Sequence, residues 1–286
     1  MKEYLTIGEL LKDFRKLNNM SKVKLAALFD VDVRTVNRWE TNITLLKPEK
    51  EEEMVEITFI PYQVIRNLNA PISIPTYYDF KLRKYSISKF SNELPDLNWI
   101  KSLSELETNR LRPIAKDSDI ELIRRASIIQ DSVSKPISSE LIRAATNILP
   151  DLNYILFDTS GFYSGHSVFF PLKRETYQKI RNRTMTEDEI TLNDFVDFKN
   201  VENPVFYVYD INADCNENLF YISFALKSFF DKLNKKHTYA SYTSRYDAIK
   251  MNEQIGNILV WEDFEMQEKL DIEFAPRLYE RINESK

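Results

Sequence analysis

Apolar and polar positions alternate with the period of an α-helix over the first forty residues. The pattern predicts a helix over Leu5–Leu17, a second that contains Val23–Phe29, and a third over about Val33–Glu40. In the first helix one apolar stripe is formed by Ile7, Leu10, Leu11, Phe14 and Leu17. In the second, apolar residues recur at helical spacing at Val23, Leu25, Ala26, Leu28 and Phe29, and the third is predicted to bury Val36 and Trp39. Thr6 and Glu9 are spaced as a capping box for the first helix.

The break between the second and third helices is the segment Asp30-Val31-Asp32. Asp32 can cap the third helix, because its carboxylate accepts hydrogen bonds from backbone N–H groups and suits the positive end of the helix. Asp30 would adopt a left-handed conformation, which aspartate tolerates at modest cost. Two short helices across a tight turn are the layout of a helix-turn-helix, although an unrelated helical bundle remains an alternative.

Met20–Glu40 resembles the DNA-binding domain of the lambda-repressor/Cro-like (XRE-type) regulator family. The matching residues are Lys24-Leu25-Ala26, Val31, Val36 and Arg38-Trp39-Glu40; Asp30 stands where that family often has glycine. The resemblance implies double-stranded DNA as a partner. It places Val33, Arg34 and Arg38 at base edges, and it places Ser21, Lys22, Thr35 and Asn37 at phosphates.

After a loop to Pro48, the branched residues of Met54–Ile60 predict a strand and Tyr62–Leu68 a short helix. The aromatic and basic residues of Tyr77–Tyr85 suit either stacking on nucleic acid or packing of a linker onto its neighbour. Ser86–Ser104 reads as a connection between domains. We therefore expect a helix-turn-helix domain at residues 1–70, a connection at 71–109 and a second domain at 110–286.

The second domain has the predicted order β-α-α-β-β-β-α-β-α-β, which indicates a mixed α/β fold around one sheet. The predicted strands are 111–115, 154–159, 166–171, 204–211, 238–242 and a last one made of 258–262 with 264–267. The predicted helices are 120–129, 138–149, 219–233 and 246–255. The expected fold class is α+β with two domains: an all-α N-terminal domain and a mixed α/β C-terminal domain.

The C-terminal domain resembles the GNAT acetyltransferase superfamily over about residues 110–267. The phrases that carry the likeness are RPIAKDSDIELIRRA and GHSVFFPLKRETYQKIRNRTMTEDEI. The resemblance implies that acetyl-CoA, if bound, would have its pyrophosphate at Ile211, Asn212, Ala213 and Asn216. The turn Asn212–Asn218 contains no glycine, lysine or arginine, and its Asp214 and Glu217 would repel a pyrophosphate.

The family's catalytic tyrosine is also missing at its expected place. The alignment puts Asn252 there and Asn257 where the family usually has phenylalanine, while Tyr246 lies on another face of the helix. Asparagine cannot act as a general acid. We expect a GNAT-like fold that has lost catalysis, with no catalytic residue and no cofactor. His166 is expected to be structural rather than a base, and nothing nearby in the sequence activates Cys215.

The composition of the chain favours some of these functional classes and argues against others. The 286 residues carry a net charge of −5, but residues 1–48 have nine Lys/Arg against six Asp/Glu, a net charge of +3 that favours a nucleic-acid contact. One cysteine and two histidines argue against a disulfide or a metal centre. No apolar run approaches the ~20 residues of a membrane span, so the expected location is the cytoplasm.

The leading hypothesis is a DNA-binding transcriptional regulator whose C-terminal domain senses a small molecule, forms a homodimer or docks a protein partner. The alternatives are an acyl-CoA-dependent N-acyltransferase with an appended targeting domain, and a non-catalytic interaction scaffold. The glycine-free turn at 212–218 counts against the acyltransferase. The outward Arg34 and Arg38 count against the scaffold.

Overall fold

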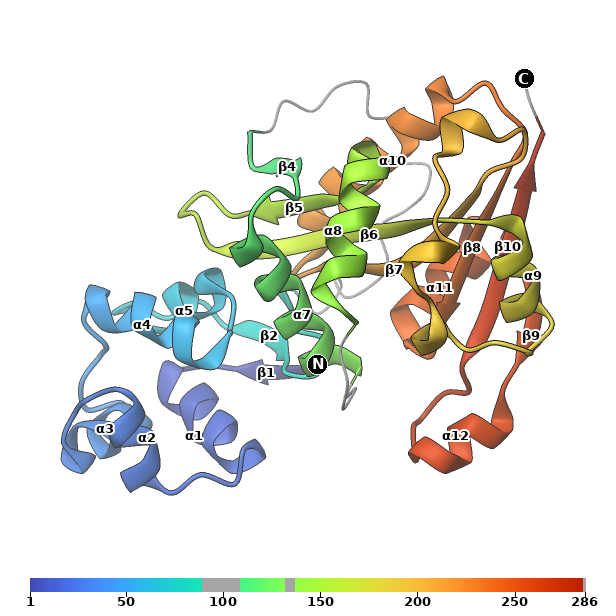
Figure 1. Ribbon diagram of the computed structural model, residues 1–286. Coiled ribbons are helices and arrows are strands. Elements are labelled where there is room, and N and C mark those ends of the chain that lie inside the picture. Colours follow the sequence, from blue (N-terminus) through green and yellow to red (C-terminus); the bar gives the residue numbers. More distant parts are fainter. Residues whose placement is uncertain (89–108, 132–136, 285–286) are drawn as a thin grey trace. The chain divides into compact units, whose positions relative to one another are not determined.

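The computed structural model describes residues 1–88, 109–131 and 137–284 (Figure 1). The chain divides into two compact units. The N-terminal unit consists of Met1–Glu93 with two short segments, Asp158–Ser164 and Asp214–Asn216. The C-terminal unit consists of Leu94–Phe157, Gly165–Ala213 and Glu217–Lys286. The predicted connection over Ser86–Ser104 lies mostly outside the described residues.

The N-terminal unit combines five helices with a small antiparallel sheet. The helices are α1 (Ile7–Leu17), α2 (Lys22–Leu28), α3 (Val33–Glu40), α4 (Pro48–Thr58) and α5 (Tyr62–Leu68). The strands β1 (Lys2–Tyr4), β2 (Thr76–Asp79) and β3 (Lys84–Ser86) pair in the order β1-β2-β3. The helical N-terminal region confirms the predicted fold class, but the sheet was not predicted. Its strands are too short to show alternation in the sequence.

Local signals place the first three helices where the sequence predicted them. Thr6 caps α1 by accepting from the N–H of Glu9, and Asp32 caps α3 by accepting from the N–H of Arg34. The Glu9 carboxylate accepts from the N–H of Leu5, so only half of the expected capping box forms.

The predicted apolar stripe of α1 is wrong at Leu17, which is exposed, and Val23 and Leu28 of α2 are exposed as well. Leu17 is the last residue of α1. The helix α2 has only seven residues and buries one face, which contains Leu25 and Ala26. Val23 and Leu28 lie outside that face.

The predicted strand at Met54–Ile60 is wrong, because this segment is the C-terminal part of α4. Pro48 occupies the first turn and acidic residues follow it, which suits a helix N-terminus. Met54, Val55 and Thr58 are spaced so that one helical face is buried. The helix ends at Phe59, which adopts a left-handed φ of 57°.

The C-terminal unit is built on a seven-stranded sheet of order β4-β5-β6-β7-β8-β10-β9. The strands are β4 (Leu111–Pro113), β5 (Tyr154–Phe157), β6 (Tyr163–Leu172), β7 (Val205–Ala213), β8 (His237–Thr243), β9 (Ile258–Glu262) and β10 (Arg277–Asn283). The helices are α7 (Asp117–Asp131), α8 (Ser139–Ile148), α9 (Arg174–Arg181), α10 (Asn216–Lys232), α11 (Tyr246–Gln254) and α12 (Phe264–Leu270). Short 3-10 turns lie at 150–152, 187–189, 192–194 and 198–200.

The order of strands and helices confirms the mixed α/β fold predicted for this region. Figure 1 shows α7 and α8 lying across one face of the sheet. α10 packs through Phe229 and Phe230 against an aromatic core that includes Phe206 of β7. β7 and β8 run parallel, as expected for strands joined by a helix.

Part of the last predicted strand of this unit is wrong and one real strand was missed. Phe264–Gln267 belongs to α12, and Asp263 caps this helix by accepting from the N–H of Met266. The final strand is β10, which lies between β8 and β9 and is antiparallel to both.

Candidate nucleic-acid interface and C-terminal cavity

The turn between α2 and α3 is held as the sequence predicted. Asp30 adopts a φ of 47° in the left-handed region, and Asp32 Oδ1 accepts from the N–H of Arg34 at 2.7 Å. The Phe29 and Trp39 rings pack edge to face with centroids 5.6 Å apart, and both side chains are buried. These contacts fix α3 against the rest of the unit and leave its opposite face to solvent.

The outward face of α3 presents two arginines one helical turn apart. Arg34 and Arg38 are exposed, and neither guanidinium has a hydrogen bond or ion pair with any residue that the structure describes. Val33 is partly exposed beside them, and Thr35 is half-buried. Three of the residues predicted at base edges are therefore accessible on one short helix.

Two of the residues predicted at phosphates are instead tied into an ion network. Glu40 is buried and accepts from Arg15 Nε at 2.6 Å and from Nη2 at 3.3 Å. Lys22 Nζ lies 3.4 Å from Glu40 Oε2 and donates to Asn37 Oδ1 at 2.6 Å. This network joins α1, α2 and α3, so Lys22 and Asn37 help to hold α3 in place.

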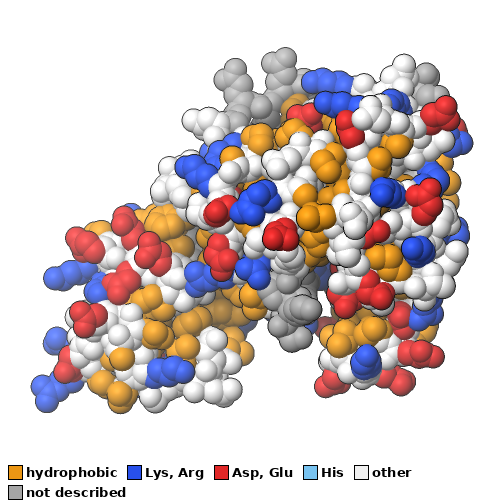
Figure 2. All heavy atoms as spheres, in the orientation of Figure 1, with side chains coloured by type: hydrophobic (Ala, Val, Ile, Leu, Met, Phe, Trp, Pro, Cys, Tyr) orange, Lys and Arg blue, Asp and Glu red, His pale blue; other side chains and the backbone are white. Residues whose placement is uncertain are grey.

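Ser21, also predicted at a phosphate, is the cap of α2. Its hydroxyl oxygen accepts from the N–H of Lys24 at 3.1 Å. The Ser21 hydroxyl oxygen is therefore already used as an acceptor for the N-terminus of α2. Its O–H group could donate to a phosphate only while this capping hydrogen bond is kept. Figure 2 shows acidic side chains gathered over α4, and a phosphate backbone would avoid that surface.

In the C-terminal unit, β7 and β8 separate part of the way along their length. They pair from Val205/Thr238 to Val208/Ser241, and the register of β6 with β7 shifts at the same level, with Tyr209 as the extra residue. A cavity of about 1360 Å³ is lined by residues of these two strands and of α10 and α11. Its apolar lining includes Val208, Ile211, Leu226, Phe230, Tyr239 and Met251.

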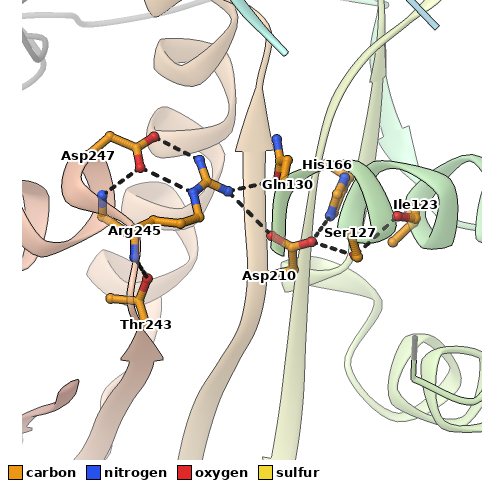
Figure 3. Close-up of polar contacts among 9 residues, drawn as sticks. Ile123, Ser127, Gln130, His166, Asp210, Thr243, Arg245 and Asp247 are labelled. Atoms are coloured by element: carbon orange, nitrogen blue, oxygen red, sulfur yellow. Dashed lines mark hydrogen bonds and ion pairs between the residues drawn. The ribbon is translucent and has the colours of Figure 1, made fainter. Parts of the chain in front are cut away.

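A connected set of buried and half-buried polar groups crosses the sheet, and its members Asp210, Arg245 and Asp247 line this cavity (Figure 3). Asp210 Oδ2 accepts from Ser127 Oγ of α7 at 2.8 Å and lies 3.0 Å from His166 Nε2. Arg245 Nη1 lies 4.0 Å from the other oxygen of Asp210. Arg245 also donates to Gln130 at 2.8 Å and, through two nitrogens, to the carboxylate of Asp247.

Within this set of polar groups, the negative charge of Asp210 is paired with His166 and Arg245. Burial alone would raise the pKa of Asp210, but the neighbouring His166 and Arg245 outweigh it and lower that pKa below its ordinary value. An ionised carboxylate only accepts hydrogen bonds, so Nε2 of His166 carries the proton in this pair. The arrangement suits a structural role for His166. The serine hydroxyl bonds to the aspartate rather than to the histidine, so the three residues do not form a nucleophilic triad.

The residues expected to hold a pyrophosphate lie at the end of β7 and at the first residue of α10. Asn212 and Ala213 are buried, and of the four only Ile211 lines the cavity. The N–H of Asp214 is already bonded to the Ser164 carbonyl at 2.9 Å, and its side chain adds a buried acid where an anion would lie.

The position expected for the catalytic tyrosine is also structural. Asn252 is buried, donates to the Ala248 carbonyl at 2.8 Å and accepts from Asn257 Nδ2 at 2.7 Å. Tyr246 is exposed at the first turn of α11. Within the described ranges, no group of three His, Cys, Asp or Glu side chains could hold a metal ion. No helix in those ranges is long and apolar enough to cross a membrane.

Sequence reasoning missed the roles of Ser127, Gln130, Asp210 and Arg245. One signal was present: Asp210 is a charged residue inside the strongly apolar run of β7, where an acid requires a partner. The partners come from α7, β6 and the start of α11, and no local pattern connects those segments.

Known proteins resemble the two parts of the chain separately. The helix-turn-helix family model matches residues 11–61. No curated protein matches the chain. Similar solved structures include the NatC complex bound to Gag peptide and CoA (14% identity, TM-score 0.39, covering 60% of this chain and 97% of that chain). Another is Arabidopsis thaliana NAA60 in complex with acetyl-CoA, with 12% identity and a TM-score of 0.39. The match covers 60% of this chain and 98% of that chain.

A mosquito arylalkylamine N-acetyltransferase, like 5b, has 14% identity and a TM-score of 0.39, with 60% of this chain and 99% of that chain covered. With TM-scores of 0.39, this likeness carries no further argument. The predicted helix-turn-helix is confirmed over residues 11–61, and the mixed α/β sheet predicted for the second domain is confirmed by the structure itself.

Proposed function

We propose that this protein is a sequence-specific regulator that binds double-stranded DNA through α3. The observation that carries the proposal is the pair Arg34 and Arg38, exposed one turn apart on a helix fixed by its caps and by the Glu40 network. An arginine that donates two hydrogen bonds to guanine contributes about 1–3 kcal/mol of discrimination against other bases. Val33, between them and the turn, can contact a thymine methyl group.

The test is binding of the full chain to a duplex recovered by selection from a random pool, at several salt concentrations. The variant Arg34→Ala/Arg38→Ala is compared with Lys116→Ala/Lys269→Ala, which removes the same charge from exposed sites of the C-terminal unit. We expect the first variant to lose at least about tenfold in affinity and most of its sequence preference, since each base contact is worth about 1–3 kcal/mol.

The control variant should bind like the unmodified protein. If no duplex is retained at low salt, or if both variants bind equally well, the proposal is wrong.

The C-terminal unit supports a second element of the proposal, a sensing role for its cavity. The cavity is large enough for a small molecule, and its lining combines apolar and aromatic side chains with many polar and charged ones, among them Asp210, Arg245 and Asp247. An acyltransferase activity is less well supported, because neither the 212–216 turn nor Asn252 offers the required groups.

Thermal unfolding of the full chain with acetyl-CoA separates these alternatives. A ligand at 100 times its Kd adds about 2.7 kcal/mol to stability. A rise in the melting temperature of the C-terminal unit would favour the acyltransferase. A cytoplasmic location and regulation of transcription follow from the DNA partner and remain part of the proposal.

A further inference from the structure

The basic and aromatic segment Tyr77–Tyr85 is packed into the N-terminal unit. Tyr78, Arg83 and Lys84 are buried, and the Arg83 side chain is only 1% exposed. Of the two interpretations of this segment, the structure therefore supports packing rather than stacking on nucleic acid. A guanidinium that has lost its hydration needs other groups to stabilise its charge.

Arg83 is surrounded by groups from two distant parts of the sequence. Its Nε donates to the Phe59 carbonyl at 2.8 Å, and its Nη2 donates to the Tyr163 carbonyl at 2.8 Å. The guanidinium carbon lies 4.5 Å from the centre of the Phe59 ring and 4.9 Å from that of the Tyr163 ring, and the two rings stack at 5.4 Å. These hydrogen bonds and ring contacts stabilise the buried charge, and they exist together only while Tyr163 lies against Phe59.

Two further contacts bring downstream residues into the N-terminal unit. The Phe162 ring lies 4.8 Å from the Tyr62 ring, and Phe162 packs against the core of this unit. The N–H of Tyr85 donates to the Asp214 carbonyl at 2.7 Å. We call these two contacts, together with those of Arg83, the Arg83 clasp.

Both downstream segments of the N-terminal unit are short connections. Asp158–Ser164 follows β5 and includes the first residues of β6, and Asp214–Asn216 leads from β7 into α10. The N–H of Asp214 donates to the Ser164 carbonyl at 2.9 Å, which joins the two segments. The turn Asp214–Asn216 lies between two residues of the cavity lining, because Ile211 precedes it and Leu219 follows it in the sequence.

We propose that the Arg83 clasp is a conformational device that makes the order of the turn Asp214–Asn216 depend on the N-terminal unit. The turn opens together with the N-terminal core, although the strand before it and the helix after it belong to the C-terminal unit. A partner that stabilises the N-terminal unit therefore orders the turn, and by reciprocity a cavity ligand that orders the turn stabilises the N-terminal unit. This regulatory meaning rests on the proposed function, whereas the dependence of the turn on the N-terminal core does not.

Thiol labelling of the full chain, without DNA or ligand, tests the proposal, because Cys215 in this turn is the only cysteine of the chain. The rate at which N-ethylmaleimide labels Cys215 reports how often the turn opens. Arg83→Met removes both hydrogen bonds of the guanidinium and keeps an unbranched side chain. Val36→Ala weakens the N-terminal core and changes no residue of the clasp. Val205→Ala is its matched control at the start of β7, since Val36 and Val205 are 0% and 1% exposed.

Arg83→Met and Val36→Ala should each label Cys215 at least about fivefold faster than the unmodified chain, because each makes opening of the N-terminal unit more frequent. Val205→Ala should label within about twofold of the unmodified chain, although hydrogen exchange will show faster opening of its sheet. The proposal is overturned if Val36→Ala speeds hydrogen exchange in α1 and leaves Cys215 labelling unchanged. Acceleration by Val205→Ala equal to that by Val36→Ala would also overturn it.

If Arg83→Met does not fold, the two valine variants still decide the question. Because the measurement contains neither DNA nor ligand, its outcome is separate from the failure or success of DNA binding.

Discussion

Replacing Glu40 by glutamine tests whether the ion network holds the recognition helix in place. The Glu40 side chain is 3% exposed, and its main partner, Arg15, is 16% exposed. Glutamine keeps the shape and one accepting oxygen, but its amide group would face a guanidinium donor. Removing one partner of a buried ion pair costs about 3–5 kcal/mol, and the partial exposure of Arg15 and Lys22 reduces our expectation to about 2–3 kcal/mol.

Hydrogen exchange measured by mass spectrometry gives a local readout of this loss. The amides of α2 and α3 should exchange about 30 to 150 times faster in Glu40→Gln, since about 1.4 kcal/mol corresponds to a factor of ten. The amides of the C-terminal sheet should be unchanged. DNA affinity should fall in the same variant although Glu40 itself is buried, because α3 would no longer be held in one orientation.

Glu49→Gln is the matched control, because it makes the same chemical change at an exposed position of α4. It should leave exchange in α2 and α3 within about twofold of the unmodified protein, as surface substitutions are usually worth less than 0.5 kcal/mol. Equal exchange in the two variants would refute the reasoning. Such a result would show that the packing of Phe29 and Trp39 alone positions α3.

Two further predictions concern stability. Gly8→Ala should lower the melting temperature of the N-terminal unit, because the added Cβ would lie 2.5 Å from the Trp39 carbonyl oxygen. Overpacking of this kind costs about 1–3 kcal/mol, more than the roughly 1 kcal/mol that alanine adds to a helix. Burial opposes ionisation of Asp210, but His166 and Arg245 lower its pKa below 3.8 in the folded chain. Its stabilising contribution is therefore complete above that pH and is lost as the pH falls through the folded pKa. Urea unfolding of Asp210→Asn should show a smaller loss of stability between about pH 5 and pH 2 than the unmodified protein, and an identical pH profile would contradict the assignment.

The helix-turn-helix could be predicted from the sequence because its signals are local. Val33–Glu40 was predicted as a helix and is α3 to the residue. Asp32 marks its start, Asp30 occupies the turn, and Val36 and Trp39 define its buried face. Each signal acts within one or two turns of helix, so the rest of the fold does not change it.

The errors arose where an apolar segment was short or where pairing was distant in sequence. Met54–Ile60 and Phe264–Gln267 were predicted as strands and are helical, since a short apolar run does not distinguish the two periods. β10 was missed because only Leu278 and Tyr279 are buried along it. Its place between β8 and β9 depends on hydrogen bonds to two strands and is invisible locally.

The C-terminal polar chain illustrates a different limit. Sequence reasoning considered His166 alone and expected it to be structural, but it could not find Asp210 or Arg245 as neighbours. His166 and Asp210 are 44 residues apart and meet because β6 and β7 pair, while Arg245 reaches the same carboxylate from the start of α11. Only the register of the sheet brings these groups together.

The two parts of the chain differ in how their charges are used. In the C-terminal unit, Asp210 lies between His166 and Arg245, and a buried charge that is already paired offers little to an incoming ligand. On α3, Arg34 and Arg38 are exposed, and no residue in the described part of the chain neutralises them. An exposed cation keeps its hydration until a polyanion replaces it, and counterion release then favours binding. The Asp210 carboxylate therefore offers little to a ligand of the cavity, whereas Arg34 and Arg38 on the recognition helix remain available to attract a polyanion.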